Sequence, residues 1–438
     1  MPNTINQNIK PFNTKRNQQG NLEISGCDTV SLAKKYGTPL YVMDEVTLRK
    51  IAREYKDAFS SYKKVNMMFA SKALMTSQIA KILHEEGFGF DVVSGGEIFT
   101  VHNANVDMNY ATFNGNNKTS DEIELALNLN VGRISVDNFY EIKLLDEIAK
   151  KKNKIQKILL RITPGIECHT HEYIQTGHLD SKFGFDLTQI DEAINIIKNE
   201  CKNLEIKGLH AHIGSQIFET QVYYDEIGVL IKELKRINEV HNLNLDEMNI
   251  GGGLGITYTN EDCPPSVYEL AGVILKSIKE NCAKYNFDEP ILYIEPGRSI
   301  VGTSGVTLYT IGSYKQVPKG RKYIAVDGGM ADNPRPSMYG AKYVAEIANK
   351  KENENFEKVT VAGRFCESGD ILIKDIELNS PETGDILCVY NTGAYGYSMS
   401  SNYNRVLKPA MVLVNNSQSD IIIKRETYEQ LVQNDVLH

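Results

Sequence analysis

The sequence predicts an α/β protein that combines a (β/α)8 TIM barrel with a C-terminal antiparallel β domain. From about residue 65 to residue 300, short apolar or β-branched runs alternate with helical segments of a dozen or more residues, which is the pattern of βα units and a parallel sheet. After residue 304, short strands follow one another without long helices between them. This change of pattern predicts a second domain with an antiparallel sheet.

Eight runs supply the strands of the predicted barrel. They are VNMMFAS (65–71), FDVV (90–93), ATFN (111–114), ISVD (134–137), ILLRI (158–162), GLHAHIG (208–214), MNIGGG (248–253) and LYIEPG (292–297). Amphipathic segments such as SDEIELALNL (120–129) lie between them, and Thr119 precedes this segment with Glu122 three residues on, the spacing of a capping box. Eight such repeats predict the barrel.

We expect three parts along the chain: residues 1–40 as an N-terminal segment that joins the β domain, residues 41–303 as the barrel, and residues 304–438 as the C-terminal β domain. The predicted strands of the last part are TLYTIGSYK (307–315), KYIAVDGG (322–329), KVTVAGRF (358–365), DILIKDIEL (370–378) and DILCVY (385–390). Two strand-like runs before the barrel, NLEISGCD and PLYVMD, are candidates for the same domain. The tail SDIIIKRETYEQLVQND (419–435) is expected to form one surface strand and one helix.

Composition narrows the class of protein. Hydrophobic residues make up 41% of the 438, and no apolar run approaches the roughly 18 residues that a membrane span requires. The N-terminus lacks the apolar core of a secretory signal, and the seven cysteines are scattered without a CxxC pair, so we expect a reducing cytoplasm and no structural zinc. A net charge of −8 without a dense basic block argues against nucleic acid or membrane as a partner, so we expect a small molecule.

Polar residues stand at the carboxyl ends of the predicted strands, where barrel enzymes carry their chemistry. In chain order they are Lys72, Asp91, Asn114, Asp137, Arg161, His212, the glycines Gly251, Gly252 and Gly253, and Glu295. Each alone is also compatible with a loop position, and Asp137 with a helix N-cap. Together they predict a functional rim.

Two motifs on adjacent strands indicate a phosphate site. NIGGGLGITY (249–258) has three glycines directly after a strand; either they form a tight turn, or their backbone N–H groups bind phosphate. A dinucleotide fingerprint needs a third spaced glycine and an immediate helix, which this motif lacks. EPGR (295–298) places Arg298 one strand over, at the usual phosphate site of a TIM barrel, although a structural ion pair is the alternative.

HAHIGS (210–215) raises the alternative of a metal-dependent hydrolase. Two histidines two residues apart on a strand point to the same face, as a ligand pair would. Such a site needs further ligands at other strand ends, and Lys72, Asn114 and Arg161 are poor metal ligands. The other close pair, in ECHTHEY, lies in a predicted loop, and we therefore expect no metal.

Lys72 ends an apolar run, which requires an explanation for its ammonium. A lysine, a phosphate-binding loop and a strand-end carboxylate are the parts that hold pyridoxal phosphate. Partial desolvation favours the neutral amine that attacks the aldehyde. The sequence therefore predicts a pyridoxal phosphate site.

The C-terminal domain adds three candidate segments. GRFCESGD (363–370) carries Cys366 beside Glu367, although a lone cysteine is most often a small buried hydrophobe. RPSMYGAKY (335–343) offers Arg335, Tyr339 and Lys342 as a carboxylate-binding set. GAYGYSMSSNYN (393–404) is either a plain strand pair or an aromatic wall.

These motifs together resemble the fold-type III pyridoxal-phosphate decarboxylases. The resemblance rests on FASKA, DVVSGGE (91–97), HTHEYIQTGHLDSKFGF (169–185), GLHAHIGSQ, NIGGGLGITY, EPGR, VDGGMADNPRP (326–336), CESGD and GAYGYSMSSNYN, and so runs over nearly the whole chain. It implies an alanine-racemase-like barrel that binds the cofactor, a C-terminal β domain, and a head-to-tail homodimer whose active sites are shared between subunits.

The resemblance also implies a role for individual residues. Lys72 would form the Schiff base with the cofactor, His212 would stack on its ring, and Glu295 would pair with the pyridine nitrogen. The remaining cofactor contacts would be Asp91, Ser215, Gly251, Gly252, Gly253, Pro296, Gly297, Arg298 and Tyr395. Arg298, Arg335 and Tyr339 would bind a distal carboxylate of the substrate, Glu367 its distal amine, and Tyr395 both substrate and cofactor. Cys366, from the partner subunit, would protonate the carbon that loses CO2.

These roles imply decarboxylation of meso-2,6-diaminopimelate to L-lysine, the last step of bacterial lysine biosynthesis. The alternative is a decarboxylase of ornithine, lysine or arginine, whose substrates lack the distal carboxylate that Arg335 and Tyr339 would bind. A regulatory homologue without catalysis is disfavoured because Lys72, Glu295 and Cys366 are all present.

Overall fold

The computed structural model describes residues 2–166, 181–351 and 355–437. The chain divides into two compact units. The first comprises Met1–Thr4, Ala52–Gly255 and Pro264–Ser299, and the second comprises Ile5–Ile51, Ile256–Cys263 and Ile300–His438.

The first unit is a closed parallel barrel, as the sequence predicts. Its strands are β5 (Val65–Ala70), β6 (Gly89–Val92), β7 (Ala111–Phe113), β8 (Arg133–Val136), β9 (Gln156–Thr163), β11 (Leu204–His210), β12 (Glu247–Asn249) and β13 (Ile291–Ile294). Each strand pairs in parallel with the next in sequence, and β13 pairs with β5 to close the ring. The short strand β10 (Phe185–Asp186) pairs in parallel with the C-terminal end of β9. All eight predicted runs supply a barrel strand.

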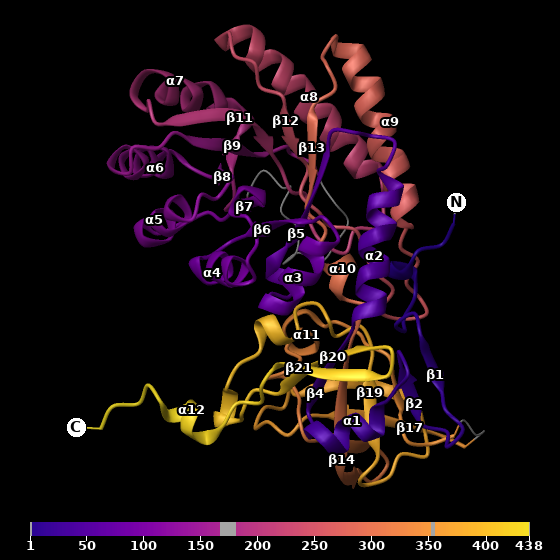
Figure 1. Cartoon of the computed structure of the whole chain (residues 1–438). Helices are drawn as coiled ribbons and strands as arrows, with labels where there is room; N and C mark the ends of the chain where they lie inside the picture. Colours follow the sequence, from indigo (N-terminus) through magenta and orange to yellow (C-terminus); the bar gives the residue numbers. More distant parts are fainter. Residues whose placement is uncertain (1, 167–180, 352–354, 438) are drawn as a thin grey trace. The chain divides into compact units, whose positions relative to one another are not determined.

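A helix follows every barrel strand, and Figure 1 shows α4 to α7 succeeding one another around the outside of the sheet. The helices are α3 (Ser77–Glu85), α4 (Gly95–Asn103), α5 (Ser120–Asn128), α6 (Phe139–Lys151), α7 (Ile190–Glu200), α8 (Gln221–His241), α9 (Val267–Tyr285) and α10 (Arg298–Val301). The predicted capping box of α5 is present: Thr119 Oγ1 accepts from the backbone of Glu122, whose carboxylate accepts from the backbone of Thr119. These caps satisfy backbone N–H groups that a helix start leaves unpaired.

The second unit is built on a mostly antiparallel sheet in the order β18-β17-β15-β14-β4-β20-β21, with β19 pairing to β14 and β16. Its strands are β4 (Leu40–Asp44), β14 (Gly305–Gln316), β15 (Lys322–Val326), β16 (Ala345–Ile347), β17 (Phe356–Ala362), β18 (Ile371–Asn379), β19 (Ile386–Val389), β20 (Ala410–Asn415) and β21 (Gln418–Ile423). Two neighbouring pairs, β15–β17 and β4–β20, are parallel. A small sheet, β1 (Thr14–Arg16), β2 (Leu22–Ile24) and β3 (Cys27–Asp28), precedes helix α1 (Thr29–Tyr36).

The unit boundary differs from the predicted one at residue 40. Residues 41–51 belong to the second unit because β4 pairs along its whole length with β14 and β20. Leu40 and Val42 lie in a core cluster with Leu308 and Val412 of the same unit. Helix α2 (Glu45–Ala58) continues from β4 and contains the division between the units.

Among the residues that the structure describes, no helix is long and apolar enough to cross a membrane.

Candidate active site

The polar residues of the predicted rim lie at the carboxyl ends of the barrel strands. Lys72 lies in the single 3-10 turn Ser71–Ala73 directly after β5, and its side chain is half-buried. Asp91 lies in β6 at the level of Ala70, the last residue of β5. Asn114 and Asp137 directly follow β7 and β8, Arg161 lies near the end of β9, and Glu295 directly follows β13.

Glu295 is the best-supported carboxylate of this rim. It is buried, and its Oε1 accepts from the Asn249 amide at 2.6 Å and from the Asn114 amide at 3.3 Å. The Nε2 of His210 lies 3.5 Å from Oε2. Burial alone raises the pKa of a carboxyl group, but the contacts with His210 and Asn249 and the charge of Lys72 outweigh it, and the pKa of Glu295 is lowered to about 2. Glu295 is therefore ionised at neutral pH.

Asp91 is also buried, but it has fewer donors. Its Oδ1 accepts from the Asn114 amide at 2.6 Å, so that this amide lies between the two carboxyl groups. Burial, and then the negative charge of Glu295, raise the pKa of Asp91 to about 7, while the charge of Lys72 acts in the opposite direction. The environments push the two pKa values apart, which is the arrangement that assigns acid and base roles in enzyme sites.

Lys72 interacts electrostatically with three carboxyl groups: Asp91, Glu295 and Glu97. Glu97, in the first turn of α4, was not predicted as a site residue. Its Oε2 accepts from the backbone N–H of Val93 at 2.7 Å, and burial raises its pKa. Lys72 is therefore a half-buried lysine whose side chain interacts with three acidic groups.

The glycines after β12 are required by the close approach of other backbone segments. A Cβ on Gly252 would lie 2.0 Å from the carbonyl oxygen of Glu295, and one on Gly253 would lie 2.6 Å from that of Gly214. The N–H of Gly251 donates to Asn249 Oδ1 at 2.9 Å, and the N–H of Gly252 to His212 Nδ1 at 3.3 Å. No hydrogen bond within the described ranges uses the N–H of Gly253, which leaves it available to a ligand.

Arg298 begins α10 beside these glycines. It is buried, and its guanidinium donates to Ser215 Oγ from both Nη2, at 2.9 Å, and Nε, at 3.2 Å. The neighbouring turn is packed tightly: the N–H of Ala70 donates to Pro296 O at 3.1 Å, and a Cβ on Gly297 would lie 2.9 Å from that of Ala70. Ser215, Gly253 and Arg298 thus form an anion-binding group.

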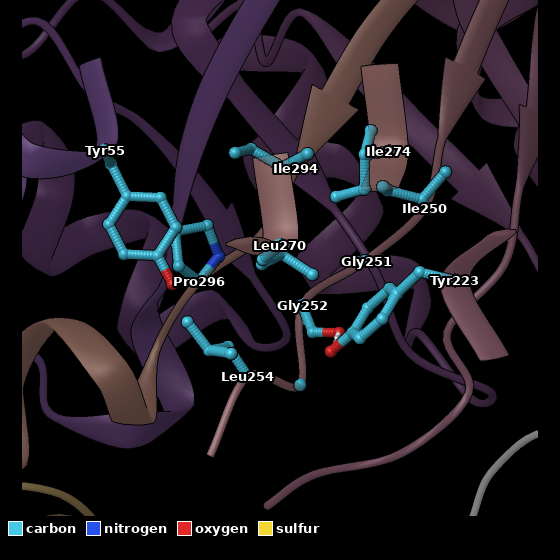
Figure 2. Close-up of a pocket in the computed structure, with 11 residues that line it drawn as sticks. Tyr55, Tyr223, Ile250, Gly251, Gly252, Leu254, Leu270, Ile274, Ile294 and Pro296 are labelled. Carbon is cyan, nitrogen blue, oxygen red and sulfur yellow. Dashed lines mark hydrogen bonds between the residues drawn. The ribbon is translucent and has the colours of Figure 1, made fainter. Parts of the chain in front are cut away.

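The glycine segment Gly251 to Gly253 forms part of the wall of a small apolar pocket (Figure 2). Tyr55, Leu270 and Ile274 line it, and the hydroxyl of Tyr223 donates to the carbonyl oxygen of Gly252 at 3.2 Å. Fixing this carbonyl holds the peptide that follows it. The Tyr223 hydrogen bond therefore helps to hold the Gly252–Gly253 peptide, and with it the N–H of Gly253.

The two histidines of HAHIGS are not equivalent, contrary to the prediction that both face the same way on one strand. Strand β11 ends at His210, which is fully buried and hydrogen-bonded, whereas His212 lies beyond the strand and is half-buried. Burial, and then the charges of Lys72 and Arg161, lower the pKa of His212 well below its usual value, so its ring is neutral at pH 7. In the described ranges no cluster of three or more His, Cys, Asp or Glu side chains could hold a metal ion, and the pair in ECHTHEY, His169 and His171, lies outside them.

Arg335 of the second unit is a buried cation. Its Nη1 donates to the Tyr343 hydroxyl at 2.8 Å, and its guanidinium carbon lies 4.9 Å from the ring centroid of Tyr258. No carboxylate in the described part of the chain forms an ion pair with it. Tyr339 ends the same short helix, α11 (Arg335–Tyr339), and Lys342 lies instead at the surface, 3.5 Å from Glu261.

The remaining predicted residues also belong to the second unit. Cys366 and Glu367 are exposed; the backbone N–H of Cys366 donates to Asn404 Oδ1 at 3.0 Å, and the Tyr403 hydroxyl donates to Glu367. Tyr395 has a positive φ of 59°, a strained conformation for a tyrosine. The exposed position of Cys366 does not follow the general tendency of a lone cysteine to be a small buried hydrophobe.

The rim fits pyridoxal phosphate. An amine is present at Lys72, an ionised carboxylate at Glu295, and an anion-binding group at Ser215, Gly253 and Arg298. Glycine is sterically required at three successive positions, Gly251 to Gly253, where the backbone packs closely against other protein atoms. These are the groups that the cofactor's aldehyde, ring nitrogen and phosphate require.

Comparison with known proteins identifies the family. Residues 48–302 match the family described as pyridoxal-dependent decarboxylase, pyridoxal binding domain. The chain is 46% identical to diaminopimelate decarboxylase of Bacillus subtilis over 97% of both proteins, and 41% identical to that of Staphylococcus aureus over 96% of this chain and 99% of the relative. The crystal structure of the M. jannaschii diaminopimelate decarboxylase with L-lysine superposes with a TM-score of 0.91 at 34% identity, over 98% of both chains. The chain belongs to the diaminopimelate decarboxylases, within the pyridoxal-dependent decarboxylases.

Proposed function

We propose that this protein decarboxylates meso-2,6-diaminopimelate to L-lysine and CO2 with pyridoxal phosphate as cofactor, the last step of bacterial lysine biosynthesis. The observation that carries the proposal is the buried, ionised Glu295 on the same barrel rim as Lys72 and the group formed by Ser215, Gly253 and Arg298. Relatives of matching length carry the name of this activity.

The barrel residues would hold the cofactor in a fixed orientation. Lys72 would bind its aldehyde carbon, and Ser215, Gly251 to Gly253, Gly297 and Arg298 would hold its phosphate. When bound, pyridoxal phosphate supplies an electron sink for the bond that breaks. Glu295 keeps a proton on the ring nitrogen because its own negative charge is retained, and the neutral ring of His212 is suited to stack on the cofactor.

The second unit supplies groups that suit the distal end of the substrate. Arg335 is buried against Tyr258 and has no acidic partner in the described residues, so a substrate carboxylate supplies the missing counter-ion. Tyr339 and Arg298 would also bind this carboxylate, Tyr395 would contact both substrate and cofactor, and Glu367 would bind the distal ammonium.

Cys366 is proposed as the acid that protonates the substrate carbon after CO2 leaves. Its exposed position in a loop is compatible with service to the active site of a partner subunit. We therefore propose a homodimer with shared active sites. The cysteines of the described residues are free thiols, which supports a reducing cytoplasm as the location.

The alternative substrates are L-lysine, L-ornithine and L-arginine, which lack the distal carboxylate. Binding any of them leaves Arg335 buried without a counter-ion, and such a mismatch is worth about 10⁴-fold in kcat/KM. Release of CO2 from meso-diaminopimelate, measured beside these three amino acids, tests the proposal. We expect preference for diaminopimelate by a factor of that order, whereas equal or greater turnover of ornithine would refute it.

A further inference from the structure

His210 links Glu295 to the opposite wall of the barrel. Its Nδ1 lies 2.9 Å from the hydroxyl oxygen of Ser135 on β8, and its Nε2, which has no hydrogen-bond partner among the described residues, lies 3.5 Å from Glu295 Oε2. The ring is 2% exposed. Burial lowers the pKa of His210, although the negative charge of Glu295 acts in the opposite direction, and in the neutral imidazole only one of the two nitrogens carries a proton.

The position of Ser135 is itself fixed by a buried lysine. The ammonium of Lys118 donates to the carbonyl oxygens of Ser135 and Gly115, each at 2.7 Å, and to the carboxylate of Glu141 at 2.6 Å. Its side chain is fully buried, and three acceptors satisfy its three protons. The backbone of β8 is thereby held at the level where the Ser135 hydroxyl meets His210.

We propose that His210 is a positioning residue for Glu295: the Ser135 hydroxyl donates to Nδ1, which fixes the proton on Nε2, and Nε2–H is directed at the Glu295 carboxylate. Together with Asn249, this donor keeps Glu295 ionised and in one orientation. The proton of the carboxyl pair then stays on Asp91, which accepts from Asn114, whereas Glu295 also accepts from Asn249. The relevance to catalysis rests on the function proposed above, in which Glu295 faces the cofactor's ring nitrogen.

Other titratable groups also surround Glu295, Asp91 and His210. The groups that face Glu295, Asp91 or His210 are Lys72 after β5, Arg161 on β9, His212 after β11, Glu97 on α4 and Glu226 on α8. His210 faces Glu295 through a nitrogen that lies 3.5 Å from the carboxylate and whose proton a second residue, Ser135, can assign.

The tautomer of His210 can be measured without cofactor. Nitrogen-15 NMR of the histidine-labelled apoprotein at pH 7 is expected to show one histidine as the neutral Nε2–H tautomer whose signals disappear in His210→Gln. A Ser135→Ala variant is expected to lose the single tautomer while the protein stays folded. Observation of the Nδ1–H tautomer or of an imidazolium at His210 would overturn the proposal, whatever substrate the enzyme proves to use.

Cofactor binding gives a second readout. His210→Leu removes the donor, and we expect pyridoxal phosphate affinity to fall by about 10- to 100-fold, the value of a hydrogen bond to a charged group. His210→Gln keeps an N–H donor and is expected to restore most of the affinity, which a purely structural role for the ring does not predict. The exposed His102 provides the control substitution His102→Gln, with unchanged affinity. Equal losses in His210→Leu and His210→Gln would contradict the proposal.

Discussion

Glu295 and Asp91 are buried carboxyl groups that share one amide donor, Asn114, yet their pKa values lie at about 2 and about 7. Glu295 has the additional donor Asn249 and faces His210, and the negative charge of Glu295 raises the pKa of Asp91. The fold thereby places a permanent negative charge on one group and a titrating proton on the other.

Replacement of Glu295 by glutamine is expected to lower kcat by about 100-fold or more, because a neutral amide cannot hold the proton on the cofactor's ring nitrogen. The matched control is Glu226→Gln. Glu226 is fully buried on α8, and burial raises its pKa well above the usual value, so this side chain is already neutral. Activity that survives Glu295→Gln but not Glu226→Gln would contradict the assignment.

Asp91 is expected to contribute to the pH dependence of the apoprotein near neutrality. Its folded pKa is raised above the value of about 3.9 in an unfolded chain, so its protonated form is favoured in the fold and its contribution to stability is lost as the pH rises towards 7. In infrared titration the carbonyl bands of protonated Asp91 and of Asp332, whose pKa is also raised to about 7, should disappear with midpoints near pH 7. Asp91→Asn should remove the Asp91 part of this transition and leave the Asp332 part.

Glu295→Gln should move the midpoint of the Asp91 carbonyl band to lower pH, because the negative charge of Glu295 contributes to the raised pKa of Asp91. An unchanged midpoint in Glu295→Gln would show that the two groups are not coupled.

Gly252→Ala should impair both folding and cofactor binding, since the added Cβ would lie 2.0 Å from the carbonyl oxygen of Glu295 and must displace one of the two segments. We expect a lower midpoint of denaturant unfolding and loss of pyridoxal phosphate in equilibrium dialysis. Gly312→Ala is the control, because its Cβ meets only Ala325 O at 3.6 Å on an exposed part of β14. Normal cofactor content in Gly252→Ala would contradict the steric argument.

Arg335→Met should reduce kcat/KM for diaminopimelate by about 10³- to 10⁴-fold by removing the counter-ion of the distal carboxylate, and should affect L-lysine turnover far less. Arg335→Lys is not expected to restore activity, because an ammonium neither stacks on Tyr258 nor binds a carboxylate through two parallel donors. Equal losses with both substrates would mean that Arg335 acts in some other way.

The barrel could be predicted from the sequence because each strand is a continuous apolar run that ends at a polar residue. PLYVMD has the same appearance: every residue of β4 is buried, as in a barrel strand. Its pairing with β14 and β20 assigns it to the other sheet, and pairing partners that lie more than 250 residues away leave no local signal. PLYVMD was named as a candidate for the β domain, whereas strand β20 was not predicted.

The supporting residues of the site were harder to predict than the residues they support. Lys72 and Glu295 stand out as charges after apolar runs, whereas Asn249 and Ser135 look like ordinary polar residues of a strand. Their roles arise from contacts across the barrel: Ser135 meets His210 75 positions away, and Asn249 meets Glu295 46 positions away. His210 entered the sequence analysis only through the rejected alternative of a metal-ligand pair, because its spacing from His212 does not reveal that β11 ends between them.

The central claim is that Lys72, at the end of β5, carries the cofactor. Borohydride reduction of the purified holoprotein, followed by proteolysis and mass spectrometry, tests it directly. The account predicts one pyridoxyl group per chain, on the peptide that contains Lys72, and none in Lys72→Ala treated in the same way. Recovery of the label on a different lysine, or a protein that binds no pyridoxal phosphate, would contradict it.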